Sequence, residues 1–271
     1  RMTATQYLRP QTLAEVQACL QQHPNAQLLA GGQSLLAAMR LGLSQPSHWV
    51  DLQDVAQLQD IRLEADHLWI GAMVTHARIA AHAGIQQHHP MLARLAHGIA
   101  DQQVRNVGTL GGSLANNDPA ACWPAGVLAY GATLVTPRRE VPADAFFTDL
   151  FTTALAREEV LLGVRFPNWS CAQYLKHEQA ASRFAMVGVA VTRASAHTPS
   201  PVRVAITVAW SVMSSLAQLS RGSRRYSRPD SENGPRQRIS LTWCVFRTTP
   251  MWVSCRCCNT SRTLPSRTWH G

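Results

Sequence analysis

Charge and long apolar runs are both scarce in this chain of 271 residues, and their scarcity excludes two broad classes of protein. Charged residues make up 15% of the sequence and hydrophobic residues 46%, a balance that excludes a chain kept disordered by its charge. No apolar run approaches the ~18–20 residues that span a bilayer. The opening segment RMTATQYLRP has no apolar centre like that of a secretory signal. We therefore expect a globular, cytoplasmic protein without a transmembrane segment.

Cysteine is also scarce and has no regular spacing. The seven cysteines form an odd set without the pattern of a disulfide framework, and only Cys19, Cys122 and Cys171 precede residue 214. The segment CRCC at 255–258 lacks the paired C-x2-C spacing of zinc sites. An iron–sulfur cluster needs four thiolates. The sequence therefore predicts a reducing compartment, no metal site, and no cluster held by this chain.

Familiar catalytic and nucleotide-binding motifs are missing too. No glycine-rich segment continues into Gly-Lys-Ser/Thr, and none has the form GxGxxG, so neither a Walker A loop nor a nicotinamide-type Rossmann site has support. The eleven histidines are scattered; His88 and His89 stand in an expected loop beside Pro90, which predicts two surface side chains. We assign no catalytic residue.

The net charge of +9 is concentrated at one end of the chain. Residues 214–271 hold ten Arg against Asp230 and Glu232, which leaves 15 basic and 14 acidic groups in residues 1–213. A nearly neutral body gives little support to nucleic-acid binding, which depends on attraction to phosphates. Nucleic-acid binding remains an alternative, and salt-dependent DNA binding that survives deletion of 214–271 would favour it.

The same segment, 214–271, has an unusual composition. It carries four of the seven Cys, three of the eight Trp and ten Ser, with Ala217 as its single alanine. This combination is typical of GC-rich coding DNA translated in the wrong frame, whereas genuine basic tails rarely contain Trp and Cys. Few aliphatic residues are available there to offset the cost of ordering the chain. We expect an irregular tail, either a frame-slip artefact or a genuine basic extension.

The first part of the chain predicts a compact α/β unit. Thr12 and Glu15 have the spacing of a capping box before an apolar face that continues to Pro24. The sequence then predicts a strand, a glycine turn, a second helix and a second strand, at residues 27–30, 31–34, 35–43 and 48–52. Such alternation is typical of an α/β unit.

The remainder predicts a larger lobe that is mainly antiparallel. Residues 61–72 alternate around a turn as a hairpin does, and residues 104–121 form a polar, glycine-rich loop. We expect helices at 75–83, 90–100 and 119–131, the last interrupted at Pro124. We expect strands at 132–136, 159–167, 172–178, 184–194 and 202–210. The fold class is therefore α+β, with a small α/β lobe followed by a larger mixed or antiparallel lobe.

Two glycine segments stand out within this framework. AGGQS at 30–34 leaves a strand and enters a helix, and GTLGGS at 108–113 again places Gly-Gly before a hydroxyl. Glycine allows close approach of the backbone to a ligand, and exposed N–H groups beside hydroxyls form a nest for an anion. Either segment alone is weak support, since Gly-Gly usually marks a turn. Two nests in two lobes suit a diphosphate clamped between them.

The order of these segments resembles one family. LLAGGQSLLAAMRLGLSQPSHWVDL (28–52), IGAMVTHARIA (70–80) and QVRNVGTLGGSLANNDPAA (103–121) are similar to the FAD-binding medium subunit of molybdenum hydroxylases, and the resemblance runs from Tyr7 to about Thr207. It implies a two-lobed FAD-binding fold followed by a C-terminal sheet domain. The implied divisions are lobe 1 at 1–57, lobe 2 at 58–170, the start of the C-terminal domain at 171–213, and the anomalous tail at 214–271.

The resemblance also implies the cofactor site. Non-covalent FAD would lie with its pyrophosphate between the two glycine segments, and Asp118 would lie near the ribityl and adenosine part. Lys176 falls in a strand that passes near the flavin ring in the family, although a solvated surface lysine is the preferred interpretation here. The implied FAD-binding residues are Ala30, Gly31, Gly32, Gln33, Ser34, Thr109, Leu110, Gly111, Gly112, Ser113 and Asp118.

Three features depart from the family pattern. Val107 stands where the family usually has a second Arg in Arg-Asn-Arg-Gly, so one positive group is missing. Cys122 and Trp123 replace a commoner acidic or aromatic pair, and we interpret Cys122 as a small buried residue, not a reactive thiol. Nothing in 214–271 resembles the family's C-terminal helices, which indicates a truncated or aberrant C-terminal domain.

By this resemblance the chain is an electron-transfer flavoprotein subunit. Its implied partners are a small subunit with [2Fe-2S] clusters and a large subunit with the molybdenum cofactor, together a dimer of heterotrimers. The flavin would pass electrons to an external acceptor. A free-standing FAD-dependent oxidase of the same fold is an alternative, but it would need its own substrate pocket and catalytic base.

Overall fold

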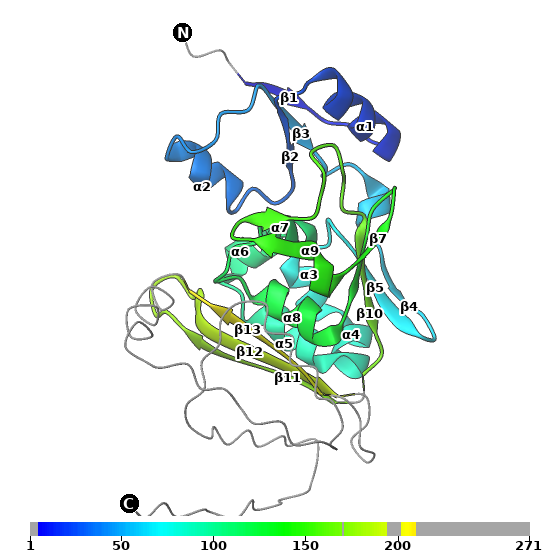
Figure 1. The fold of residues 1–271 in the computed structure, drawn as a ribbon, viewed down its shortest axis with the longest axis vertical. Coiled ribbons are helices and arrows are strands. Elements are labelled where there is room, and N and C mark those ends of the chain that lie inside the picture. The colour runs from blue at the N-terminus through cyan, green and yellow to red at the C-terminus, as the bar shows by residue number, and fades with distance from the viewer. Residues whose placement is uncertain (1–4, 170, 194–201, 210–271) are drawn as a thin grey trace, which may run out of the picture.

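The computed structural model describes residues 5–169, 171–193 and 202–209. Its first unit is a parallel three-stranded sheet in the order β1-β3-β2 (Figure 1). The strands are β1 (Gln6–Leu8), β2 (Ala26–Leu29) and β3 (His48–Asp51), and the two connecting helices are α1 (Leu13–Gln22) and α2 (Leu35–Arg40). Helix α2 buries none of its residues, whereas α1 packs Val16 and Leu20 into the core of this unit.

The start of α1 shows how local sequence positions the first unit. The Thr12 hydroxyl accepts a hydrogen bond from the Glu15 N–H at 3.2 Å, as an N-cap residue should. The Glu15 carboxylate accepts from the Gln11 N–H at 2.7 Å, one residue before the position that a capping box predicts. Thr12 thus satisfies one of the free backbone donors of the first turn, and the helix begins where the sequence predicts.

A five-stranded antiparallel sheet in the order β4-β5-β10-β6-β7 follows. Its strands are β4 (Ile61–Leu63), β5 (His67–Gly71), β6 (Thr133–Val135), β7 (Glu140–Pro142) and β10 (Gly163–Pro167), and β8 (Phe147–Asp149) with β9 (Thr152–Thr153) form a small separate pair. Six helices lie between β5 and β6 in the chain: α3 (His76–Ala81), α4 (Ala83–His88), α5 (Pro90–His97), α6 (Gln102–Val107), α7 (Leu110–Asn116) and α8 (Cys122–Tyr130). Two short helices complete this part, η1 (Ala56–Leu58) and α9 (Ala143–Phe146).

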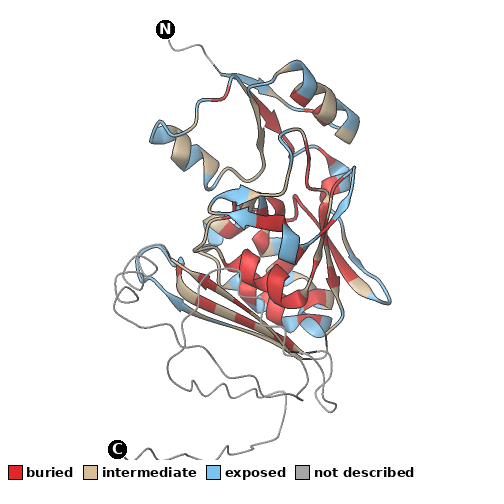
Figure 2. Cartoon of the chain, viewed as in Figure 1, coloured by how far each residue is buried: buried red, intermediate tan, exposed pale blue. Residues whose placement is uncertain are grey.

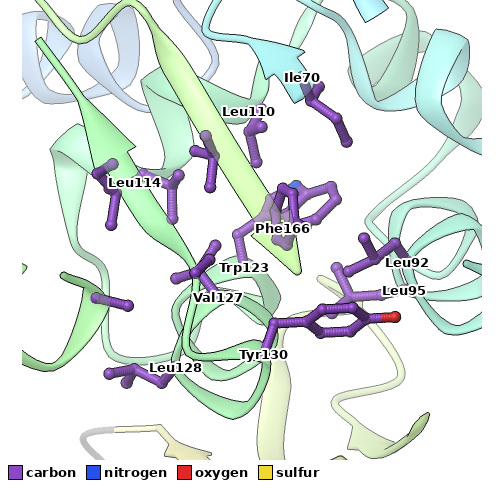
Figure 3. Packing of buried hydrophobic residues seen from close by; sticks show 14 of the residues in the cluster. Ile70, Leu92, Leu95, Leu110, Leu114, Trp123, Val127, Leu128, Tyr130 and Phe166 are labelled. Carbon is purple, nitrogen blue, oxygen red and sulfur yellow. The ribbon is translucent and has the colours of Figure 1, made fainter. Parts of the chain in front are cut away.

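Helix α8 is the centre of the largest core. All nine of its residues are buried, because it contacts β10 on one side and the strands β12 (Ala185–Arg193) and β13 (Val202–Val208) on the other. Figure 2 shows this central band as the most continuous buried part of the chain. Trp123, Tyr130 and Phe166 pack together there with Leu92 and Leu95 of α5 (Figure 3). A helix that is apolar on every face fits such a position.

The last described sheet closes over α8 from below in Figure 1. Strands β11 (Cys171–Glu178), β12 and β13 are antiparallel neighbours in that order. Small side chains face the helix, since Ala190 and Ala205 are buried in the same cluster as α8. Arg203 adds a polar clamp, because its guanidinium donates to the Leu128 carbonyl and pairs with Asp144.

Most of the predicted elements are confirmed, and the exceptions are instructive. Every predicted strand is present, with ends that differ from the prediction by a few residues. The helices predicted at 75–83 and 90–100 are present as α3 and α5. The glycine-rich loop is wrong in part, since residues 110–116 form helix α7. Pro124 does not interrupt α8, because it occupies the first turn, where no intrahelical donor is needed. His88 is exposed as predicted, but His89 is buried at 3% exposure beside Tyr130.

Other sequence predictions fall outside what is described. The irregular tail at 214–271 lies beyond the described residues, so the structure says nothing about it. The division into lobes stays a prediction, although the buried residues do form two clusters, one centred on Val16, Val50 and Leu58 and one on α8. Within the described ranges, no helix has the length and hydropathy to cross a bilayer, and no group of His, Cys, Asp or Glu is arranged to hold a metal.

Candidate functional site

A cavity of about 1090 Å³ opens between the parallel sheet, the helices after β5 and the turn between β11 and β12. Ten of the eleven predicted site residues line it. Leu110 does not; it is fully buried and belongs to the main core cluster. The two glycine segments lie far apart in the sequence, yet both line this cavity. A ligand that both segments bind requires such an arrangement.

The first glycine segment presents an unpaired backbone to this cavity. Among the described residues, no group accepts a hydrogen bond from the N–H of Gly31, Gly32, Gln33 or Ser34. Gly32 has φ +67°, a conformation that L side chains rarely adopt. Ser34 precedes α2 without a side-chain cap bond. Four successive free donors in a curved backbone form the kind of nest that binds an anion.

Gly31 is also the point where the two segments touch. A Cβ atom placed on Gly31 would lie 2.2 Å from the Val107 carbonyl oxygen and 2.8 Å from the Gly108 Cα. Such distances are far below van der Waals contact, so only glycine permits this approach. The requirement for glycine at position 31 is therefore one of packing between segments and not only of ligand access.

The second segment uses its backbone differently. The Leu110 N–H donates to the Val74 carbonyl at 3.0 Å and the Gly111 N–H to the Ala72 carbonyl at 2.8 Å. The Gly112 N–H donates to the Thr109 hydroxyl at 3.1 Å, which makes Thr109 the N-cap of α7. The prediction of a second open nest is therefore wrong, because these N–H groups are already bonded inside the protein.

What the second segment offers to a ligand is space and hydroxyls. A Cβ on Gly111 would meet the Ala72 Cβ at 2.6 Å, so that glycine serves close packing. A Cβ on Gly112 would lie 3.4 Å from the Ala30 Cβ of the first segment. Gly112, Thr109 and Ser113 all line the cavity. This wall carries two hydroxyls and lies next to the donor-rich residues 31–34.

Asp118 lies at another part of the cavity wall. Its Oδ1 atom accepts from the Ala120 N–H at 2.8 Å, which fixes the side chain as an Asx turn. No hydrogen bond within the described residues uses its Oδ2 atom. The carboxylate therefore keeps one oxygen that could accept a hydrogen bond from a ligand hydroxyl.

His76 is a buried residue of the wall that sequence patterns did not identify. Its Nδ1 atom accepts from the Trp123 indole N–H at 3.1 Å. Burial, and secondarily the charge of Arg105, lower the pKa of His76 from 6.5 to about 4. The ring is therefore neutral at physiological pH. No local sequence signal marks this histidine, because its burial depends on tertiary packing.

Arg105 is a buried cation close to the same wall. Its guanidinium donates to the carbonyls of Ile99 and Ala100 at 2.9 and 2.7 Å and to the Gln102 side chain at 3.0 Å. No carboxylate within the described chain pairs with it. A buried positive charge without a counter-ion favours a nearby anion.

The turn between β11 and β12 forms the far wall of the cavity, with Ala181, Ser182, Arg183 and Phe184. Lys176 holds this turn, because its ammonium donates to the carbonyls of Gly98 and Arg183 and pairs with Glu178 at 3.1 Å. The Lys176 side chain is only 9% exposed, so its interpretation as a solvated surface lysine is wrong. Phe184 remains 48% exposed and presents an aromatic ring at the opening.

Cys122 lines the cavity at the start of α8. The residue is 6% exposed, and burial raises the pKa of its thiol. A thiol that is harder to ionise than usual is a poor nucleophile. The geometry supports the interpretation of Cys122 as a small buried residue.

Comparisons with known proteins point to one family. Residues 3–169 match the family described as the FAD binding domain in molybdopterin dehydrogenase. The chain is 37% identical over 211 residues to the carbon monoxide dehydrogenase medium chain of Hydrogenophaga pseudoflava, covering 74% of each protein. It is 34% identical over 215 residues to the nicotine 6-hydroxylase medium subunit of Paenarthrobacter nicotinovorans, covering 76% of this chain and 75% of that subunit.

Solved structures agree with these relatives. Carbon monoxide dehydrogenase from Hydrogenophaga pseudoflava, in a form lacking the Mo-pyranopterin moiety of the molybdenum cofactor, superposes with a TM-score of 0.72 at 36% identity over 75% of this chain and 74% of that one. Quinoline 2-oxidoreductase from Pseudomonas putida superposes with a TM-score of 0.71 at 30% identity, covering 82% and 87% of the two chains.

Proposed function

Since the chain belongs to the family of FAD-binding domains of molybdopterin dehydrogenases, we propose that it binds FAD in the cavity described above and serves as the electron-transfer subunit of such a dehydrogenase. The observation that carries the proposal is that the two glycine segments meet at one cavity, where the first segment has four free N–H groups. Bound FAD would supply the redox chemistry. The chain would hold it, orient it and limit its contact with water.

The donor-rich first segment would hold the diphosphate. The N–H groups of residues 31–34 would supply hydrogen bonds, and Thr109 and Ser113 would add hydroxyls from the second segment. The uncompensated charge of Arg105 would raise the positive potential at the same place. The Val107 position, where an arginine is usual in the family, contributes no charge; its side chain is 49% exposed, so the loss is at the surface.

The two ends of the cavity would accept the two flat ring systems of the dinucleotide. Phe151 and Phe184 are exposed aromatic side chains on the wall formed by Asp118 and the β11–β12 turn, and an exposed aromatic ring suits stacking on a flat ligand. Asn25, Gln27 and Arg157 line the cavity as well, with Arg157 bonded to Asn25 of the first unit. We therefore place the isoalloxazine toward Phe184 and the adenosine toward Arg157.

The chain would act only as part of a larger assembly in the cytoplasm. Substrate oxidation would take place on a molybdenum subunit, and an iron–sulfur subunit would carry the electrons to the flavin. The relatives are named as medium chains or medium subunits, which supports this division. A dimer of heterotrimers is the assembly that we propose.

Flavin release tests the cofactor assignment. Acid precipitation of the purified chain should leave FAD in the supernatant at one per chain, because no covalent link holds it. FMN in the supernatant, or flavin retained in the protein pellet, would contradict the proposal. Replacement of Gly112 by Val should abolish flavin uptake, because the new side chain would meet the Thr109 hydroxyl and the Ala30 side chain.

The partner assignment has its own test. The purified chain alone should oxidise no organic substrate, whereas activity should appear when the molybdenum and iron–sulfur subunits are added. Turnover by the single chain would instead favour a free-standing oxidase. Co-purification of a tagged chain from its source should recover both partners together.

A further inference from the structure

The segment IGAMVTHARIA at 70–80 resembles the flavoprotein family, but it contains no residue to which the proposed function gives a role. The structure places it against the second glycine segment. The His76 N–H donates to the Gly108 carbonyl at 2.9 Å, and the Leu110 N–H donates to the Val74 carbonyl at 3.0 Å. This short antiparallel bridge between Thr75 and Thr109 fixes His76 beside Gly108. The position of the imidazole is therefore tied to the ligand-binding wall.

The bond with Trp123 decides which nitrogen of His76 carries the proton. The Trp123 indole N–H can only donate, so the Nδ1 atom that receives it must be unprotonated. In a neutral imidazole the proton is then on Nε2. His76 is thus held as a hydrogen-bond donor through Nε2, by a partner that lies on α8 in the main core.

The Nε2 atom points to the junction of the two glycine segments. A Cβ on Gly108 would lie 3.1 Å from Nε2, and Gly108 is itself the residue that Gly31 approaches most closely after Val107. His76 lines the cavity. Nε2 has no hydrogen-bond partner among the described residues, and it is not among the fully buried unpaired atoms of that part of the chain. A donor in this situation is available to a ligand.

The surroundings keep the ring neutral. Burial first, and the charge of Arg105 second, lower the pKa of His76 to about 4. A neutral donor of fixed tautomer needs no proton uptake and little reorganisation when an anion binds. Arg105 supplies the positive charge, and His76 supplies a directed N–H.

We propose that His76 donates a hydrogen bond from Nε2 to a phosphate oxygen of the bound FAD, with Trp123 as the positioning residue that sets its tautomer. The proposal rests on the diphosphate lying between the two glycine segments. It assigns a specific function to the buried histidine of the 70–80 segment. It also gives the Nε2 donor of His76 a partner, which an almost fully buried polar ring needs.

Two substitutions of His76 in the full chain test the roles of its two ring nitrogens one at a time. His76→Asn places an amide near the Nδ1 position, so it can still accept from Trp123 but cannot reach the cavity. His76→Gln places its amide nitrogen near the Nε2 position and can still donate to the ligand. Hydrogen bonds to charged groups are strong, so His76→Asn should weaken FAD binding to the flavin-free chain about tenfold or more, and His76→Gln should recover most of this loss.

Binding of ADP and of riboflavin distinguishes a lost phosphate contact from a general loss of structure. ADP, which carries the diphosphate, should lose affinity for His76→Asn by about the same factor as FAD, whereas riboflavin, which has none, should bind the variant and the original chain equally. The 31P resonances of bound FAD should shift more in His76→Asn than in His76→Gln. Nitrogen NMR of the unsubstituted chain should show His76 protonated on Nε2, both free and with FAD.

Several results would overturn the proposal. These are FAD affinity unchanged in His76→Asn, an equal loss in both variants, an equal loss for riboflavin, or a proton on Nδ1 of the unsubstituted chain. The NMR measurement needs no variant, so a folding defect cannot obscure it. If the unsubstituted chain binds no FAD at all, the proposed function itself fails. If it binds FAD and only the His76 results disagree, this inference fails alone.

Discussion

The two glycine segments of the cavity look alike in sequence but use their backbones in opposite ways. Residues 30–34 leave four successive N–H groups free, and Gly32 has φ +67°. Residues 110–112 bond their N–H groups to the Val74 carbonyl, the Ala72 carbonyl and the Thr109 hydroxyl as helix α7 begins. A Gly-Gly pair before a hydroxyl residue can therefore have different structural roles. In the first segment glycine frees donors, and in the second it removes side chains.

The largest expected effect comes from breaking the contact between the segments. In Gly31→Ala the new Cβ would lie 2.2 Å from the Val107 carbonyl oxygen, so the segments would have to separate. Overpacking of this kind costs about 3 kcal/mol or more, and the cavity would open where the diphosphate binds. FAD affinity, measured by fluorescence titration, should fall by a factor of about a hundred or more. Near-normal affinity would show that the contact is not needed.

Acid should destabilise the folded chain through His76, which is packed against Gly108 of the second segment. The pKa of His76 is lowered from 6.5 to about 4, first by burial and then by Arg105. Between pH 6.5 and pH 4, His76 binds a proton in the unfolded chain but not in the folded chain. The contribution of neutral His76 to the free energy of unfolding is therefore fully present above pH 6.5 and is lost as the pH falls toward 4. The loss approaches about 3 kcal/mol.

Urea unfolding of the flavin-free chain, from about pH 7 down to about pH 4.5, measures this dependence. His76→Asn should reduce the slope, because no titrating group remains at that position. Some slope should persist, since burial also lowers the pKa of His89. An unchanged slope in His76→Asn would show that another group is responsible.

A pair of glycines with similar backbone strain tests the ligand contact. Gly32 and Gly42 have nearly equal positive φ values, +67° and +72°, but only Gly32 lines the cavity. Nothing lies within 4 Å of a Cβ on Gly42, and a Cβ on Gly32 would lie 2.9 Å from Cδ1 of Leu36, an exposed side chain that can move aside. Alanine at either position should cost about 1 kcal/mol of stability. Only Gly32→Ala should weaken FAD binding as well. Equal FAD affinity in both variants would remove the first segment from the site.

The difference between the segments also shows what sequence could and could not predict. Composition and periodicity located the longer strands and the longer helices, because these depend on local pattern, but not the short strands β1, β7, β8 and β9. Helix α7 was missed because two glycines disfavour a helix locally, and its start is fixed by hydrogen bonds to Val74 and Ala72 from a distant segment. Its one local signal was Thr109, whose hydroxyl caps the helix.

The remaining wrong predictions at the site concern which side chains are buried. Lys176 and His89 are polar residues that sequence alone places at the surface, and tertiary partners bury both. Leu110 belonged to the right motif, but it faces the core and not the cavity. His76 became visible only when its partner Trp123, 47 residues away, was in place. Motif position identified the cavity, whereas the direction of each side chain required the fold.

The smallest expected effect is that of deleting residues 214–271. Every residue that lines the main cavity in the described chain lies at or before Phe184, so both glycine segments and their contact remain when the tail is removed. A chain ending at residue 213 should therefore bind FAD with unchanged affinity. A chain ending at residue 200 is the control, because it also loses β13, whose Ala205 packs in the core around α8 and whose Arg203 holds the Leu128 carbonyl and Asp144. That control should lose stability and flavin together. Loss of FAD in the first truncation would mean that residues after β13 complete the site, and the contrast between the two segments would then describe only part of it.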